Sequence, residues 1–461
     1  MTTTEPVAYQ YEPTAPDRSA PARKPPRSSR ASHGTGFWFV AAAFMALMAF
    51  GTVPTPLWPL YQARDHFGPT VVTVAFAVMV VGAAASFLTL GHLSDRFGRR
   101  RIVVPALLVA TLASVTLLAW PALPGLIVGR LLTGVAVGLM ASTATTYLAD
   151  LYHEAHPDRE GSPVPGLVAA ASNLGGLALG PLIAGLLAEW APAPLVTPYA
   201  LFAIAMLGFL VLVLSTPETV DLELPDRQQP TRFALRPGAG PAFAAASVVG
   251  FFAFAALGLF SSLGAIIIRG QLHITSHAIA GVAPFTMFAA SAVAQLALGT
   301  LPLVRLMKIG VVLFPGGMAL TAVSLYHPTL TLFLVAAGIA GAGAGLLFKG
   351  AASQIAMAAA PTSRAGVLAM FFVIAYIGMG APSIAFSMVI QHVRLQPAMI
   401  GFAIMLSCGA MAAAAATSRS ATRRRARGRH RRATRRASGQ HRASRRRGGS
   451  PRAGSGAHRT S

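Results

Sequence analysis

The chain has 461 residues, of which 54% are apolar and only 11% are charged, and its formal net charge is +23. Soluble domains carry about a quarter charged residues, so this composition excludes an ordinary soluble protein and indicates a chain that lies largely in a bilayer. The apolar runs are about 20 residues long and do not alternate with a period of two. They therefore predict membrane-spanning helices rather than the strands of a closed barrel.

Both ends of the chain are polar. Residues 1–35 are rich in proline and lack the apolar core of a secretory signal, so we expect a disordered tail. Residues 417–461 hold 16 of the 37 basic residues and no acid, so most of the net charge is local. This second disordered tail has three interpretations: attraction to anionic lipid, which its tether to the membrane favours, contact with nucleic-acid phosphates without sequence specificity, or no function.

Apolar windows predict twelve transmembrane helices. In chain order they are 37–60, 71–93, 102–120, 126–148, 164–188, 198–215, 241–268, 278–301, 309–326, 329–348, 366–390 and 398–416. Pro54, Pro56 and Pro59 fall at the end of the first window, where a broken backbone is tolerated near an interface or a cavity.

Arginine and lysine fix the expected orientation. If both tails are cytoplasmic, the loops on the other side contain only Arg64, Arg269 and Arg394 as basic residues. Because cytoplasmic loops are enriched in Lys and Arg, we expect both termini in the cytoplasm and a multi-pass protein of the plasma membrane.

The two halves of the chain are related in sequence. Gly134-Val-Ala-Val-Gly138 matches Gly341-Ala-Gly-Ala-Gly345, and other echoes recur at similar offsets. We therefore expect a six-helix bundle at 36–216, a cytoplasmic linker at 217–240 and a second six-helix bundle at 241–416. Parallel repeats of this kind are typical of transporters that rock two halves around a central site.

Three motifs carry a family resemblance over residues 36–416. The loop GHLSDRFGRR at 91–100, the run from Leu126 to Gly138 and the run from Gly176 to Gly185 together resemble motifs of the major facilitator superfamily. The resemblance implies an all-α membrane protein with two pseudo-symmetric six-helix bundles, and secondary transport by alternating access. The last of the three runs is similar to a motif associated with exporters in that family.

The loop at 91–100 is the predicted conformational latch. Gly91 and Gly98 permit close approach and a tight turn, while Arg96, Arg99 and Arg100 hold the loop on the cytoplasmic side. The resemblance implies that the Asp95 carboxylate faces the start of span eleven, near 363–366, when that side is closed. A helix N-terminus attracts an anion, so this contact would hold the two halves together. The alternative is that the loop sets topology only.

Span four contributes the coupling candidates Arg130, Gly134, Gly138 and Asp150. Arg130 has two interpretations. In the first it acts in coupling or binds a carboxylate of the cargo. In the second its side chain snorkels to the outer interface or pairs with Asp65 or Glu189. Asp150 is expected to engage the arginines of the 94–101 loop. The span-five motif residues are Gly176, Gly180, Pro181 and Gly185.

None of the 14 acidic residues lies deep in a span, which weakens the case for the proton antiport that the exporter motif suggests. Polar and aromatic side chains within the spans are candidates to line a substrate cavity. The alternatives are contacts between helices for the polar ones, lipid-facing positions for the rings, and a reach to the cytoplasmic interface for Lys349. These candidates are Phe76, Asn173, Phe251, Gln295, Lys349 and Tyr376.

We find no phosphate-binding loop, metal-ligand spacing or catalytic constellation, so we expect neither an enzyme nor a cofactor. The leading hypothesis is a monomeric exporter of a small amphipathic molecule, with protons as a further candidate partner. The alternatives are an importer or symporter of sugars or organic anions, and a membrane sensor or scaffold that does not transport.

Overall fold

The computed structural model describes residues 31–90, 97–159, 161–220 and 233–416. Within them lie 12 helices that are long and apolar enough to cross a membrane, as the hydropathy windows predict. The predicted all-α membrane fold is confirmed, and the one β-bridge among the described residues joins Leu235 to Ala359.

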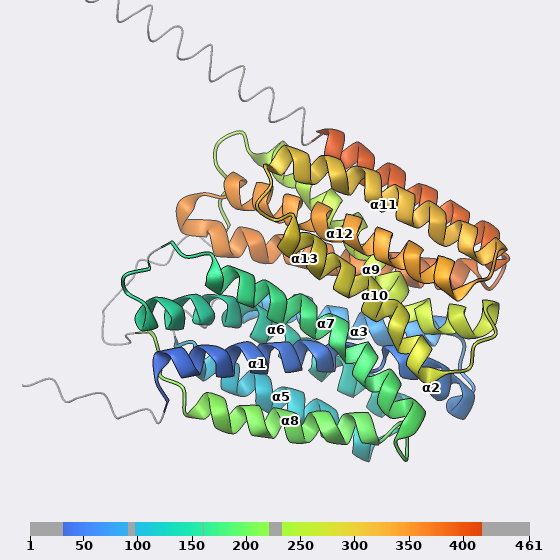
Figure 1. Ribbon diagram of the computed structural model, residues 1–461, viewed down its shortest axis with the longest axis horizontal. Helices are drawn as coiled ribbons and strands as arrows, with labels where there is room; N and C mark the ends of the chain where they lie inside the picture. The colour runs from blue at the N-terminus through green and yellow to red at the C-terminus, as the bar shows by residue number, and fades with distance from the viewer. Residues whose placement is uncertain (1–30, 91–96, 160, 221–232, 417–461) are drawn as a thin grey trace, which may run out of the picture.

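The first six spans form the N-terminal bundle (Figure 1). Its first span is composite, because Pro54, Pro56 and Pro59 interrupt the backbone hydrogen bonds of a continuous helix. The elements of this bundle are α1 (His33–Thr52), the short turn η1 (Thr55–Leu57), α2 (Trp58–Asp65), α3 (Pro69–Thr89), α5 (Arg100–Ala119), α6 (Leu123–Ala155), α7 (Val164–Trp190) and α8 (Thr197–Leu214).

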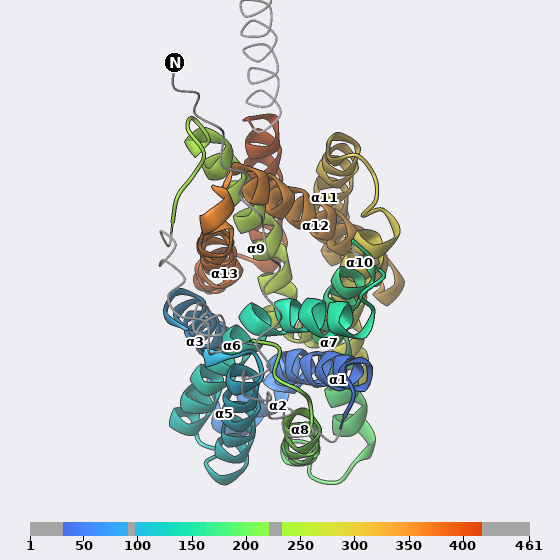
Figure 2. The same ribbon diagram turned by 90° about the vertical axis from the view of Figure 1, so that its left-hand side faces the viewer.

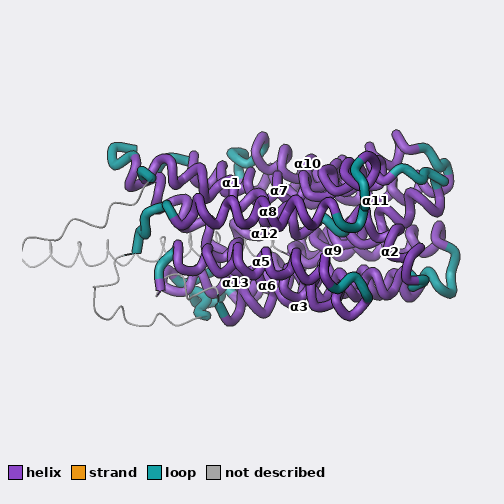
Figure 3. Tube along the Cα trace, turned by 90° about the horizontal axis from the view of Figure 1, so that it is seen from below, coloured by secondary structure: helices purple, strands orange, loops and turns teal. Residues whose placement is uncertain are grey.

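The C-terminal bundle repeats this arrangement. Its elements are α9 (Gly240–Gln271), α10 (His277–Ala297), α11 (Leu303–Tyr326), α12 (Leu330–Ala358), the turn η2 (Pro361–Ser363), α13 (Arg364–Val389) and a last helix (Leu395–Ala416). Most connecting loops lie at the two ends of the molecule (Figure 3). We call the end at which α1, α5 and α7 begin the proximal end, and the opposite end, which includes α2, the distal end.

The internal repeat is visible in how glycines bring helices together. Gly134 of α6 packs on the Met79 carbonyl of α3, and its counterpart Gly341 of α12 packs on the Met287 carbonyl of α10. A Cβ at either glycine would collide with backbone atoms, so these positions require the smallest residue. The sequence echo between the halves therefore reflects one helix contact used twice.

Among the described helices, two pairs make the most extensive contacts between the bundles. α3 lies beside α13, and α7 lies beside α10, as the view from the proximal end shows (Figure 2). We call these pairs the two seams. Any movement of one bundle against the other must change the contacts along them.

Candidate transport machinery

The predicted latch loop is described only in part. Gly91, Asp95 and Arg96 lie outside the described residues, so the contact expected between Asp95 and the start of α13 stays a prediction. Gly98 is described and has a φ of +106°, a left-handed conformation that favours glycine. A Cβ at Gly98 would also lie 2.5 Å from the Glu218 carboxylate. The turn at the end of this loop therefore requires glycine for two independent reasons.

The residues that follow Gly98 are bound to their own bundle. The Arg99 backbone N–H donates to Glu218 Oε1 at 2.7 Å, and Arg99 Nε donates to Asp150 Oδ2 at 3.2 Å. Arg100 Nη1 donates to the carbonyl oxygen of Thr216 at 2.8 Å. Because Arg99 is the N-cap of α5, Glu218 places its negative charge where a helix favours an anion. We call this set the proximal plate: Gly98, Arg99, Arg100, Asp150 and Glu218.

The proximal plate contains the expected contact between Asp150 and a loop arginine, but sequence reasoning missed the role of Glu218. This residue follows the end of α8, and the nearby Tyr147 Oη donates to the Pro217 carbonyl at 2.6 Å. Nothing in the spacing along the chain connects position 218 with position 99. Only the fold brings the two together.

The two glycines of the span-four motif bring α6 against α3. Gly134 packs on the Met79 carbonyl, while a Cβ at Gly138 would lie 2.5 Å from Ser86 Cβ and 2.8 Å from the Ala83 carbonyl oxygen. These glycines therefore set the distance between two helices of the same bundle.

Arg130 lies on α6 and is fully buried, with 1% of its surface exposed. Its Nη1 donates to the Gly51 carbonyl at 3.0 Å, and its guanidinium carbon lies 5.9 Å from the ring centre of Trp58. It does not snorkel, because it is buried. It does not pair with Asp65 either, because that carboxylate binds Arg64 at 2.7 Å. Both of these interpretations are therefore wrong.

The span-five motif divides between two neighbours of α7. Gly176 and Gly180 pack on the backbone of α1, at the carbonyls of Met45 and Ala49. Further along the helix, Pro181 and Gly185 face α10 of the other bundle, where a Cβ at Gly185 would lie 2.7 Å from the His277 carbonyl oxygen. The first part of the motif thus packs α7 against α1, and the second part packs α7 against α10 of the other bundle.

A carboxylate closes the distal end of the α7–α10 seam. Glu189, near the end of α7, accepts hydrogen bonds from the backbone N–H groups of His277 at 2.6 Å and Ala278 at 3.4 Å. The next N–H of α10, at Ile279, donates to the Ser276 side chain at 3.3 Å. The free donors at the start of α10 are therefore satisfied partly by the opposite bundle. We call the Glu189 contact the distal clasp.

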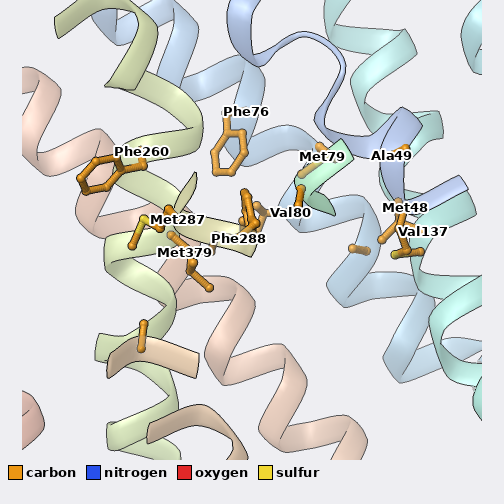
Figure 4. Packing of buried hydrophobic residues seen from close by; sticks show 14 of the residues in the cluster. Met48, Ala49, Phe76, Met79, Val80, Val137, Phe260, Met287, Phe288 and Met379 are labelled. Carbon is orange, nitrogen blue, oxygen red and sulfur yellow. The ribbon is translucent and has the colours of Figure 1, made fainter. Parts of the chain in front are cut away.

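The α3–α13 seam is also closed near its distal end. The hydroxyls of Thr73 and Ser387 lie 2.8 Å apart, and Gln391 donates to Thr70. Buried apolar side chains of both bundles belong to one cluster, and Figure 4 shows Val80 of α3 and Phe288 of α10 among them. Phe76, a candidate to line the substrate cavity, is only 1% exposed and belongs to the same cluster.

The remaining cavity candidates lie in different places. Gln295 is 8% exposed, and its side chain donates to Ser291 of its own helix. Lys349 donates to the Gln295 carbonyl at 2.7 Å, so its charge stabilises the C-terminal end of α10. Phe251 is half-buried on α9, where its backbone packs against Gly378 of α13. Asn173 is half-buried on α7.

Tyr376 belongs to a circuit of aromatic rings toward the proximal end. Neighbouring ring centres in the circuit lie 4.6 to 5.8 Å apart. Phe87 comes from α3 of the N-terminal bundle and stacks on Phe372 of α13, with ring planes 3° apart. Of these five rings, the sequence analysis singled out only Tyr376, because no feature of the sequence distinguishes buried aromatic residues in a span from lipid-facing ones. The circuit consists of Phe87, Tyr376, Phe254, Phe348 and Phe372.

Comparison with known proteins agrees with this architecture. The family described as Major Facilitator Superfamily matches residues 39–301. The chain is 30% identical over 154 residues to the uncharacterized MFS-type transporter YybF of Bacillus subtilis, covering 33% of this chain and 37% of that protein. It is 29% identical over 140 residues to the bacillibactin exporter of the same organism, covering 29% of this chain and 34% of that protein.

The alignments span about a third of the length of these relatives. The crystal structure of the human organic anion transporter MFSD10 resembles the whole fold, with a TM-score of 0.61 and 16% identity over 85% of this chain and 100% of that one. In the described residues, no group of three or more His, Cys, Asp or Glu side chains is placed to hold a metal. Since the family match covers more than half of the chain, the protein belongs to the Major Facilitator Superfamily.

Proposed function

We propose that this secondary transporter is an exporter of a small amphipathic molecule, and that its proximal end faces the cytoplasm of a plasma membrane. Export is supported by the span-five motif around Gly180 and Pro181 and by the name of one relative, the bacillibactin exporter. The orientation is supported by the basic residues, which concentrate in the tails and in the loops at the proximal end.

The observation that carries the proposal is the composition of the seams. Apolar groups from both bundles meet there: Val80 of α3 lies beside Gly380 of α13, Phe87 stacks on Phe372, and Gly185 of α7 packs on Gly281 of α10. At the distal ends of the helices, a few hydrogen bonds also join the bundles, namely Thr73 with Ser387, Gln391 with Thr70, and the distal clasp. Two bundles joined by apolar contacts and a few peripheral bonds can part without leaving buried charges unpaired. An apolar surface so exposed suits an amphipathic cargo.

In this proposal the distal and proximal ends of the protein close in turn. The distal clasp between Glu189 and α10 holds the distal side closed, and Asp95 makes the equivalent contact with the start of α13 when the proximal side closes. Both contacts place a carboxylate of the N-terminal bundle at a helix N-terminus of the C-terminal bundle. Proton coupling would then act on one or both of these carboxylates rather than on an acid deep in a span.

Transport by the full chain in proteoliposomes tests the proposal. With an imposed pH gradient and a panel of fluorescent hydrophobic compounds, sugars and organic acids, we expect movement of hydrophobic compounds in the export direction. Asp95→Asn should abolish most of this transport while the protein still inserts and folds. The matched control is Asp158→Asn, which removes an exposed carboxylate from a neighbouring loop at the same end. Equal transport by the two variants would rule out the Asp95 contact.

An importer of organic anions is the second candidate, favoured by the fully buried Arg130 with no carboxylate partner among the described residues. Accumulation of organic acids inside the same vesicles would select it. A scaffold is distinguished by deleting residues 417–461, since a monomeric transporter whose tail only binds anionic lipid should keep its transport activity.

A further inference from the structure

The surroundings of Arg130 leave part of its hydrogen-bonding capacity unused. Nη1 donates to the Gly51 carbonyl at 3.0 Å, and Nη2 lies 2.8 Å from the sulfur of Met79. The Nε–H is buried and has no hydrogen-bond partner among the described residues. A thioether is a weak acceptor, so a charged group with five donors has one good acceptor, the Gly51 carbonyl.

A second unsatisfied donor lies next to it. Trp58 is fully buried, and its indole Nε1 has no hydrogen-bond partner in the part of the chain that the structure describes. The Trp58 ring centre lies 5.9 Å from the guanidinium carbon of Arg130. Buried donors without partners are rare in folded proteins, and two on adjacent side chains point to a shared acceptor.

The charge of Arg130 also lacks compensation. The two acids that were expected to pair with Arg130 have other partners: Asp65 binds Arg64 at 2.7 Å, and Glu189 forms the distal clasp. No other described carboxylate forms an ion pair with Arg130. A buried cation is tolerated only with an opposite charge or a full set of acceptors, because the loss of hydration is large. Binding of an anion would therefore stabilise this environment, since none of the described carboxylates neutralises Arg130.

We propose that a small monoanion binds between Arg130 and Trp58, inside the N-terminal bundle where α2, α3 and α6 meet. It would accept from Arg130 Nε and Trp58 Nε1 and neutralise the guanidinium. The side chain of Met79 occupies the remaining side of the guanidinium, and its flexible thioether can rotate away to admit the ion and release Nη2. The ligand is either a free inorganic anion such as chloride or the carboxylate of a small organic acid. This site does not depend on the direction of transport.

Purified full-length protein tests the site by thermal unfolding at constant ionic strength, with chloride or acetate replacing bulky gluconate. The transition temperature should rise with the concentration of at least one small anion and saturate. Saturation with chloride identifies a free inorganic ion as the ligand, and saturation with acetate alone identifies a carboxylate. No saturable rise with either anion overturns the proposal.

Two variants locate the effect. Trp58→Phe keeps the ring but removes the indole donor, and should raise the anion concentration at half-saturation several-fold. Arg130→Met should abolish the saturable rise and make stability in gluconate equal to or higher than that of the wild type, since no buried charge remains. The control Arg269→Met removes an equal charge from an exposed position and should keep the anion response. A response that survives in both Trp58→Phe and Arg130→Met places the anion elsewhere and refutes the site.

A spectroscopic reading is independent of folding yield. The chain has four tryptophans, and the other three, Trp38, Trp120 and Trp190, are between 49% and 73% exposed. Replacing these three with phenylalanine leaves Trp58 as the single reporter. Its emission should change with chloride or acetate along the same saturation curve as the thermal shift, and an unchanged spectrum would contradict binding beside the indole.

Discussion

Substituting Gly185 with alanine should push the two bundles apart at the distal end. The new Cβ would lie 2.7 Å from the His277 carbonyl oxygen and 3.2 Å from the Gly281 Cα, both backbone atoms that cannot rotate away. Overpacking of this kind typically costs about 1 to 3 kcal/mol. Because α7 and α10 belong to different bundles, separation relieves the strain without unfolding either one. A penalty of this size shifts a two-state population by roughly 5-fold to 150-fold.

Spin labels across the distal end measure that shift. A groove of about 350 Å³ lies between α2 and α9 there, and Ala63 and Gly270 line its opposite sides. With the single native cysteine, Cys408, replaced by serine, cysteines at these two positions carry the label pair. We expect a longer distance in Gly185→Ala than in the parent protein.

The control is Gly175→Ala on the same helix, where the nearest atom to a new Cβ is the flexible end of Met45 at 3.7 Å. Gly175→Ala should leave the distance distribution unchanged. If Gly185→Ala gives the same distribution as the control, the α7–α10 seam does not govern opening of the distal side, and the reasoning fails.

Three further substitutions probe other contacts. Gly98→Ala should lower the unfolding temperature of the purified protein more than Gly161→Ala. Both glycines have a positive φ, but only a Cβ at position 98 would meet the Glu218 carboxylate. Equal losses of stability would show that backbone strain alone matters. Tyr61→Phe removes a buried hydrogen bond of 3.0 Å to Tyr199 and should cost about 1 kcal/mol in denaturant unfolding, whereas no change would show that the bond contributes nothing net. Phe87→Ala opens the aromatic circuit and should cost about 3 to 5 kcal/mol, with Phe87→Leu recovering most of it in the same assay; an undiminished stability would show that the ring stacks are dispensable.

The fold was predictable because the bilayer leaves few choices. A long apolar run must form a helix to satisfy its backbone, so windows of hydropathy locate the spans, and three prolines mark the break in the first one. Close helix contacts were also predictable from Gly134 and Gly341, because repeated glycines in apolar spans signal close packing.

Partners of charged residues were harder to predict. Glu189 and Glu218 both bind backbone donors at the N-terminal end of a helix, but these donors lie 88 and 119 residues away from the acids. Every residue type except proline carries the same backbone N–H group, so the sequence does not show which of these groups a carboxylate will bind. Arg130 shows the complementary limit: its type and position suggest a function, whereas its lack of a carboxylate appears only when the surrounding helices are assembled.

The length of α6 sets the surroundings of the proximal plate. At 33 residues it extends about 50 Å, whereas the hydrocarbon layer of a bilayer is about 30 Å thick. Its last turns, which carry Asp150, therefore project into the headgroup region. Ion pairs there are screened by salt and respond to anionic lipids. We therefore expect the stability of the proximal plate to depend on ionic strength and on the anionic lipid content of the membrane.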